Sequence, residues 1–132
     1  AGGLGAAFKV FLNANMKSGI ETVLDLIEFD KLLEGVDMVV TGEGRIDWQS
    51  AFGKVPSGIG QRCKNHGIPA IAIVGGMGTG ADKIFEFGVE SIIPTINGAM
   101  DIEEALDRAV ELYKGAADRA FRLVRVGMEI KK

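Results

Sequence analysis

The fold of this chain is decided by an apolar run that leads into a polar, glycine-rich stretch: Val36-Asp37-Met38-Val39-Val40, then Thr41-Gly42-Glu43-Gly44-Arg45-Ile46-Asp47-Trp48-Gln49-Ser50, closed by Gly53-Lys54. Residues 36–41 predict a buried strand, because a strand covered on both faces is almost continuously apolar. Charged and amide side chains then stand among glycines before the next helix. Since open α/β sheets bind ligands at the carboxyl ends of their strands, we expect a ligand site between Thr41 and Lys54.

Two more strands are expected downstream, each followed by a helix. Residues 68–74 are nearly all apolar, and residues 91–94 form a shorter run that ends at a proline, which cannot donate to a sheet ladder. The spacing of apolar residues predicts helices over residues 56–66, 81–87 and 102–127. Strands that alternate with helices in this way predict an α/β fold with a parallel sheet.

The first 35 residues predict a helical lead-in. Residues 4–15 carry apolar side chains at helical spacing, and Ser18 with Glu21 matches a capping box at the start of a second helix. The opening glycines could expose backbone N–H groups to an anion, or could simply allow a tight turn. Because the chain starts at Ala1 inside this glycine-rich turn, we expect it to be a fragment of a longer protein.

Composition excludes several classes of function. The 132 residues are 47% hydrophobic and 25% charged, with a net charge of −3, so neither nucleic acid nor an anionic membrane is an expected partner. The single cysteine, Cys63, excludes an internal disulfide, is expected to be a packed side chain, and favours a reducing, cytoplasmic setting. With one His and one Cys, a zinc site lacks ligands.

The charged groups of the polar stretch are those that phosphoryl transfer requires. Lys54 and Arg45 could hold phosphate oxygens or a carboxylate. Glu43 and Asp47 could bind Mg²⁺ through oxygen, or take a proton from a substrate hydroxyl. A kinase site combines these parts. The alternative is a salt-bridged loop in which Glu43, Arg45 and Asp47 neutralise one another.

Two common nucleotide motifs do not fit. Val55 follows Lys54, and no glycine lies five residues before Gly53, so the stretch is not a Walker A loop. The second glycine-rich turn, Gly76-x-Gly78-x-Gly80, differs from the dinucleotide fingerprint G-x-G-x-x-G. We therefore do not interpret it as an NAD site.

The polar stretch resembles the signature of the bacterial glycerate kinase family, of the type related to the glucarate and glyoxylate pathways. The resemblance is carried by Thr41-Gly42-Glu43-Gly44-Arg45-Ile46-Asp47-x-Gln49-Ser50-x-x-Gly53-Lys54-x-Pro56-x-Gly58. The opening residues 1–7 are similar to a glycine-rich segment of that family, and the similarity extends over essentially the whole chain. Trp48 stands where smaller or polar residues are more usual, and we expect it to alter packing rather than chemistry.

The resemblance implies ATP- and Mg²⁺-dependent phosphorylation of D-glycerate to a phosphoglycerate. It also implies that residues 1–132 are about the last third of a longer enzyme, the C-terminal part of its Rossmann-like domain. In this interpretation residues 1–35 are a helical lead-in and residues 36–132 a βαβαβα segment. The expected fold is a three-layer α/β/α arrangement whose parallel sheet is incomplete in this chain.

Carried over by position, the expected catalytic residues are Asp47, Lys54, Arg45 and Glu43, of which Asp47 and Glu43 are also the expected metal ligands. The expected cofactor-binding residues are Gly42, Gly44, Gln49, Ser50, Gly53, Gly3 and Gly5. The missing N-terminal part would face this half-site, so we expect the isolated chain to be inactive. Its open sheet edges predict pairing with that part or with a second copy. The alternatives are a non-catalytic nucleotide- or anion-binding module and an oligomerisation piece.

Overall fold

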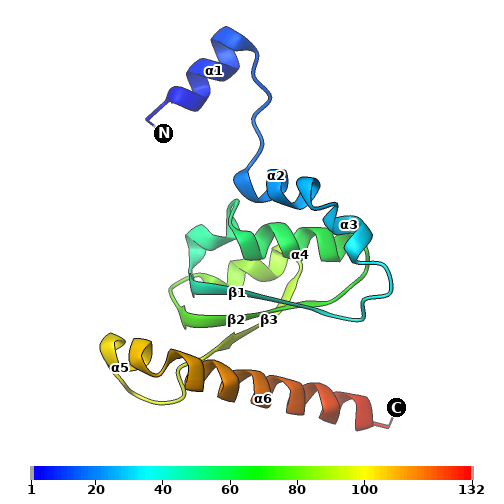
Figure 1. Cartoon of the computed structure of the whole chain (residues 1–132), viewed down its shortest axis with the longest axis vertical. Coiled ribbons are helices and arrows are strands. Elements are labelled where there is room, and N and C mark those ends of the chain that lie inside the picture. The colour runs from blue at the N-terminus through cyan, green and yellow to red at the C-terminus, as the bar shows by residue number, and fades with distance from the viewer. Residues whose placement is uncertain (1, 132) are drawn as a thin grey trace.

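A computed structural model describes residues 2–131, apart from the side chain of Ala51, and its centre is a three-stranded parallel sheet (Figure 1). The strands β1 (Val39–Ile46), β2 (Ala70–Met77) and β3 (Val89–Pro94) lie side by side in the order β1-β2-β3. Both neighbouring pairs are parallel. The α/β prediction is therefore confirmed.

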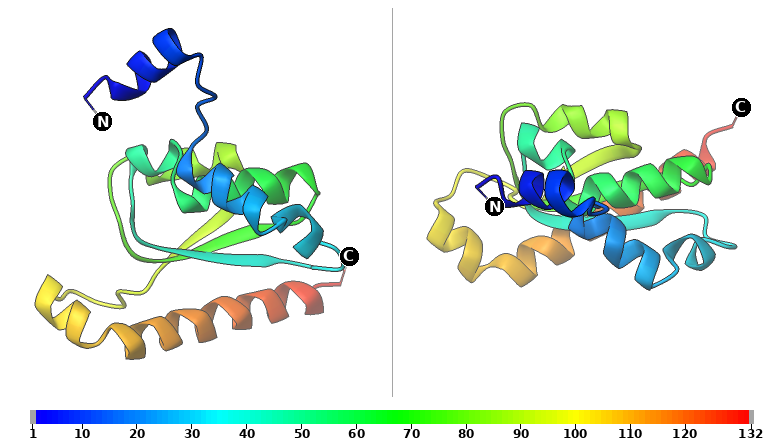
Figure 2. Two further views of the ribbon diagram at one scale, coloured as in Figure 1. Left: turned by 45° about the horizontal axis from the view of Figure 1, so that its top comes forward. Right: turned by 90° about the horizontal axis from the view of Figure 1, so that it is seen from above.

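Helices cover both faces of this sheet (Figures 1 and 2). On one face, α4 (Val55–Asn65) packs against the strands together with the 3₁₀ helix η2 (Ala81–Phe87). On the other face, α6 (Ala109–Glu129) crosses beneath β2 and β3. The last helix was predicted as one piece over residues 102–127, but α5 (Ile102–Asp107) is separated from α6 at Arg108.

The first two strands begin later and end later than predicted. The strand expected over residues 36–41 continues to Ile46, and the strand expected over residues 68–74 continues to Met77. Glycine makes this extension possible, because the two strands lie too close for a side chain at this point. A Cβ atom on Gly75 would lie only 2.6 Å from the carbonyl oxygen of Gly44. Much of the polar stretch is therefore a strand end rather than a loop.

The core lies mainly between the sheet and the α4 layer. One buried cluster joins the strands to η2 and consists of Ile46, Ala72, Val74, Ala81, Ile84 and Val89. A second joins α4 to the lead-in and consists of Leu33, Cys63 and Ala70. Cys63 is completely buried, as predicted, and this burial raises the pKa of its thiol.

The lead-in contains three short helices, α1 (Leu4–Leu12), α2 (Gly19–Leu26) and α3 (Phe29–Leu32). As predicted, Ser18 caps α2, since its Oγ accepts a hydrogen bond from the backbone N–H of Glu21 at 3.3 Å. In contrast to α2, helix α1 has no buried residue and stands away from the sheet (Figures 1 and 2). The lead-in is thus docked only from α2 onward.

A cluster of charges around Arg62 fastens α2 and α3 to α4. The guanidinium donates to Asp25 Oδ1 and Glu21 Oε2, each at 2.6 Å, and also pairs with Asp30. These carboxylates raise the pKa of Arg62. Asp30 lies inside α3 and also contacts Nε2 of His66 at 2.7 Å. This contact joins the end of α4 to α3.

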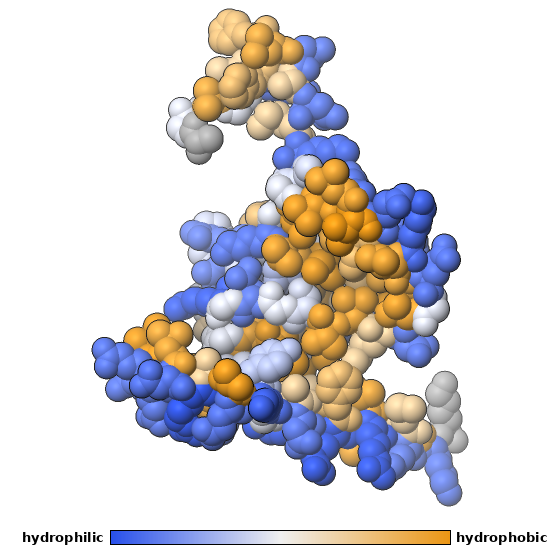
Figure 3. Space-filling model, viewed as in Figure 1, coloured by the Kyte–Doolittle hydropathy of each residue, from blue (hydrophilic) through white to orange (hydrophobic). Residues whose placement is uncertain are grey.

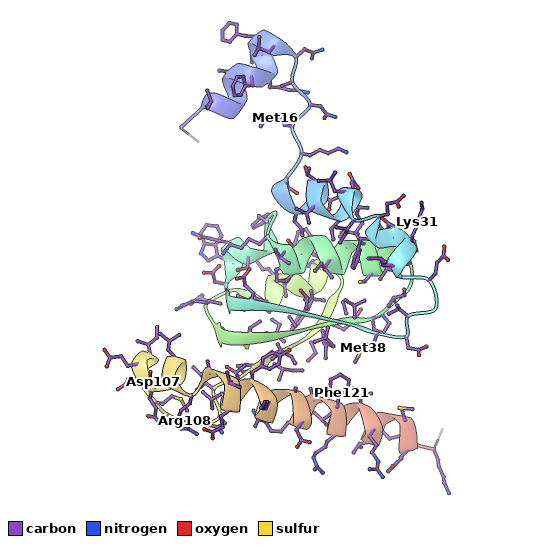
Figure 4. All side chains as sticks on the ribbon, in the orientation of Figure 1. Met16, Lys31, Met38, Asp107, Arg108 and Phe121 are labelled. Atoms are coloured by element: carbon purple, nitrogen blue, oxygen red, sulfur yellow. The ribbon has the colours of Figure 1, made fainter. Side chains whose placement is uncertain are left out.

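An apolar surface remains uncovered beside β1. On α6 only Leu112, Ala116 and Ala120 are buried, whereas Phe121 is half exposed and points toward the sheet layer (Figure 4). Figure 3 shows apolar surface over α2 and α3 that continues toward α6.

None of the helices within residues 2–131 has the length and apolarity needed to cross a bilayer.

Candidate functional site

The polar stretch turns sharply where β1 ends, and Asp47 fixes that turn. Its Oδ1 accepts hydrogen bonds from the backbone N–H groups of Gln49 at 3.0 Å and Ser50 at 3.2 Å, which begins the 3₁₀ helix η1 (Trp48–Ala51). In return, the Oγ of Ser50 accepts from the backbone N–H of Asp47 at 3.2 Å. This reciprocal capping box holds the end of the strand in one conformation.

The environment of Asp47 keeps its carboxylate ionised. Partial desolvation acts to raise its pKa, but the hydrogen bonds from Gln49 and Ser50 and the positive charge of Lys54 outweigh it, so the pKa lies below its usual value. A carboxylate of low pKa is a weak proton acceptor. The geometry therefore favours an electrostatic or metal-binding role for Asp47 over general-base catalysis.

Ser50 was expected to bind a cofactor, and in the structure it takes part in the turn. Its side chain is completely buried. Besides its bond with the Asp47 N–H, its hydroxyl lies 3.3 Å from the Arg45 carbonyl oxygen and from Asp47 Oδ1. Ser50 shapes the turn and has no surface left for a ligand, whereas the neighbouring Gln49 is exposed.

The glycine turn after β2 packs against this same site. The N–H of Gly78 donates to the Ile46 carbonyl oxygen at 2.7 Å, and the N–H of Trp48 donates to the Thr79 carbonyl oxygen at 3.0 Å. A Cβ atom on Gly78 would lie 2.9 Å from both Arg45 Nη2 and Asp47 Cβ. The sequence of this turn suggested no role beyond the NAD motif that it does not match. The signal available in the sequence was that the ends of neighbouring parallel strands meet at one edge.

Lys54 is placed at the beginning of α4. It is the N-cap residue, without a side-chain cap, and its carbonyl oxygen accepts from Ser57 Oγ at 2.9 Å and from the Gly58 N–H at 3.1 Å. Gly53 before it adopts a left-handed φ of 73°. Pro56 lies in the first turn, as predicted. A lysine at the amino end of a helix adds its charge to the helix dipole, which suits an anion.

Glu43 lies on β1, and its Oε1 accepts the N–H of Gly44 at 3.0 Å. Among residues 2–131 no ion pair within 4.0 Å joins Glu43, Arg45 and Asp47, because the ion pairs lie elsewhere in the molecule. The alternative of a mutually neutralised salt-bridged loop is therefore wrong. These charges remain available to a ligand.

Glu43 and Asp47 fit a magnesium ion only with help from other groups. No cluster of three or more His, Cys, Asp or Glu side chains that could hold a metal is present in the described part of the chain. Within that part, Glu43 Oε2 and Asp47 Oδ2 have no hydrogen-bond partner. Mg²⁺ commonly binds one or two carboxylates plus water and phosphate oxygens. The two carboxylates suit a magnesium–nucleotide complex, not an all-protein cage.

The structure brings most of the predicted residues together, with one clear exception. Gly42, Gly44, Gly53 and the four charged residues lie on β1 or between it and α4. Gly3 and Gly5 belong to the start of α1, which stands apart from the sheet (Figure 1). The prediction that they share a cofactor site with the polar stretch is not supported by this arrangement, because residues 13–17 connect α1 to α2 without any helix or strand.

Comparisons with known proteins identify a family. The model of the glycerate kinase family matches residues 1–125. A glycerate kinase of Bacillus cereus is 42% identical over 129 residues, which are 98% of this chain and 34% of that protein. A glycerate 2-kinase of Escherichia coli is 34% identical over 125 residues, 95% of this chain and 31% of that protein.

A solved structure gives the same result at the level of fold. A crystal structure described as a glycerate kinase 2 from Salmonella typhimurium LT2 superposes with a TM-score of 0.65 at 34% identity, over 98% of this chain and 33% of that one. The chain thus spans about a third of the length of the relatives it matches. Matched along nearly its whole length by the family model, the chain belongs to the glycerate kinase family.

Proposed function

We propose that this chain forms part of a kinase that transfers the γ-phosphate of ATP to a hydroxyl of D-glycerate, giving a phosphoglycerate. The observation that carries the proposal is that Arg45 and Asp47 both lie against Gly78 and Lys54 begins α4, in a member of the glycerate kinase family. Phosphoryl transfer depends mainly on positioning and charge stabilisation, which these groups can supply.

In this proposal the two cations have distinct positions. Lys54, at the amino end of α4, binds phosphate oxygens of the nucleotide together with the helix dipole. Arg45 lies against Gly78 and binds either a phosphate or the glycerate carboxylate, for which its planar guanidinium is suited. Both charges oppose the negative charge that spreads over the transferring phosphoryl group.

The two carboxylates divide the remaining roles. We assign Asp47, which is held ionised, as the ligand that would carry Mg²⁺, and Glu43 as a second ligand or as the acceptor of the glycerate hydroxyl proton. When bound, the metal would neutralise charge on the nucleotide phosphates. Hydrogen bonds that a carboxylate accepts stabilise its ionised form and make it a weaker base. Glu43 is therefore better suited to take the hydroxyl proton, because it accepts a single hydrogen bond whereas Asp47 Oδ1 accepts several.

The groups that complete the site are proposed to lie outside this chain. The chain spans about a third of its relatives' length, and β1 and β3 are both edge strands of the sheet. We propose that these edges pair with the remainder of a longer cytoplasmic enzyme, or with a second copy when the chain is isolated. Light scattering of the isolated chain should then show species larger than a monomer; a clean monomer would count against edge pairing.

The decisive experiment is a coupled kinase assay of the full-length protein that carries this chain, with D-glycerate and Mg-ATP. Asp47→Asn and Lys54→Ala should each lower kcat about a hundredfold, as loss of one charge-stabilising group commonly does. The Asn amide oxygen can still accept the capping bonds, so the turn should survive. Asp82→Asn and Lys83→Ala, exposed on η2, are the matched controls and should be neutral.

Two outcomes would contradict the proposal. Near-normal turnover in both site variants would remove these residues from the chemistry. Binding of Mg-ATP by the wild-type protein with no turnover of glycerate would instead favour a non-catalytic nucleotide- or anion-binding module.

A further inference from the structure

A cavity of about 340 Å³ opens beside the proposed phosphate site, between the start of α2 and the start of α4. Its apolar walls include Ile20, Phe52 and Phe87. The two phenylalanine rings meet edge to face with centroids 6.1 Å apart. Phe52 nevertheless keeps 64% of its surface exposed, directly before Gly53. A large aromatic face is thus presented to solvent at the rim of a concave surface.

The polar groups of this cavity include both acceptors and donors. Glu21 uses Oε2 to accept from Arg62, which leaves its Oε1 as an acceptor. The side-chain Nε2 of Gln61 donates one of its two hydrogens to Asn65 Oδ1 at 3.1 Å, which leaves the Gln61 carbonyl oxygen as an acceptor and one N–H as a donor. Ser18 Oγ accepts from a backbone N–H, so its hydroxyl proton remains available to donate. Of these side chains, the Glu21 carboxylate can only accept.

This pattern matches one purine better than the other. The edge of adenine presents an amino group that donates and ring nitrogens that accept, whereas guanine presents a carbonyl acceptor where adenine has its amino group. The Glu21 carboxylate suits the adenine amino group and would face the guanine carbonyl without a hydrogen, and the Gln61 carbonyl oxygen adds a second acceptor for the amino group. Bases also stack on aromatic side chains.

The cavity is continuous with the residues assigned to phosphate. Gly53 lines it, and the next residue is Lys54. Ser57 also lines it, and its hydroxyl bonds to the Lys54 carbonyl oxygen at 2.9 Å. We propose that this cavity binds the adenine base of the nucleotide, with Phe52 as the stacking surface and Lys54 at the phosphate end. The inference rests on the proposed kinase function, because it assigns the base of the same ATP molecule.

The test separates the base from the phosphates. Calorimetric titration of the full-length protein with Mg-ATP and with magnesium tripolyphosphate should show tighter binding of ATP. Phe52→Ala should raise the Kd for ATP about tenfold, the usual effect of losing one stacked base, and leave the Kd for tripolyphosphate unchanged. Phe85→Ala is the matched control, since Phe85 is a 47% exposed phenylalanine of η2 that does not line the cavity.

A second variant tests the hydrogen-bonding edge without touching the aromatic pair. Gln61→Leu removes one acceptor, and the preference for ATP over GTP should fall about fivefold, as expected for one hydrogen bond. An unchanged preference, or a Phe52→Ala protein that loses ATP and tripolyphosphate equally, overturns the adenine assignment. If glycerate phosphorylation persists while these results fail, only the cavity is misassigned. If the wild-type protein binds no ATP, both proposals fall.

Discussion

Two glycine-rich strand ends lie side by side in this molecule and use glycine for opposite purposes. The end of β1 alternates glycines with charged side chains, and a Cβ atom on Gly44 would meet nothing within 4 Å. The end of β2 and the turn after it carry no charged side chain up to Gly80. There, a Cβ atom on Gly75 would lie 2.6 Å from a backbone oxygen of β1.

The difference shows that the geometry of a site can depend on residues without functional groups. In β1, glycine leaves the backbone uncovered beside Glu43 and Arg45, where a ligand could approach. In the second stretch, glycine lets one chain segment lie directly against the other: Gly80, for example, adopts a φ of 72°, and a Cβ there would lie 2.9 Å from Trp48 Cβ. The first stretch carries the chemistry, and the second holds it in place.

The largest effect should come from adding a methyl group where the two strands touch. Gly75→Ala places a Cβ against the Gly44 carbonyl oxygen, and because backbone cannot rotate aside, the strands must separate. We expect the free energy of unfolding to fall by about 3 kcal/mol, as for severe overpacking. Urea unfolding of the full-length protein measures this change in the free energy of unfolding. Gly44→Ala is the control and should change stability by less than about 0.5 kcal/mol; equal losses in both variants would erase the distinction between the strands.

A smaller effect, on activity rather than stability, is expected at Gly78. Its added Cβ would meet Arg45 Nη2 and Asp47 Cβ at 2.9 Å, so Gly78→Ala should displace the guanidinium and lower kcat about tenfold. Gly76→Ala, two residues earlier in β2 and with open space around it, should be neutral.

A double variant shows whether Gly78 acts through Arg45. In an Arg45→Ala background, Gly78→Ala should cost little further activity, since the displaced group is already absent. A full additional tenfold loss would mean that the turn acts through Asp47 or through general disruption instead.

Much of this fold could be predicted because local signals agreed with tertiary packing. Apolar runs marked all three strands, and Ser18 marked the start of α2 where the structure has it. Strand ends were harder to predict. Glycine is typical of turns, so the extension of β1 through Gly42 and Gly44 required knowledge of the neighbouring strand.

The site could be predicted in its charges but not in its supports. Asp47, Arg45 and Lys54 stand out in the sequence because they are charged residues among glycines directly after an apolar run. The turn-capping role of Ser50 was not predicted, because a hydroxyl looks the same in sequence whether it faces a ligand or caps a turn. The contact of Gly78 with Arg45 depends on sheet register, which no local pattern specifies.

The smallest expected effect concerns the pH dependence of the first strand end, which alone of the two stretches carries ionisable groups. Because the folded-state pKa of Asp47 lies below its usual value of 3.8, its ionised form stabilises the fold above that pH. This contribution should disappear as the pH falls through the lowered pKa. Asp47→Asn has no such titration, so the stability difference between wild type and variant should shrink as acid is added. Other acid-sensitive carboxylates, such as Asp25 and Asp30, are common to both proteins and cancel in the comparison.

Urea unfolding at a series of acidic pH values measures the difference in stability between wild type and Asp47→Asn, with Asp82→Asn as the control. A difference that stays constant down to the lowest pH would mean that the capping bonds at η1 do not depend on the charge of Asp47.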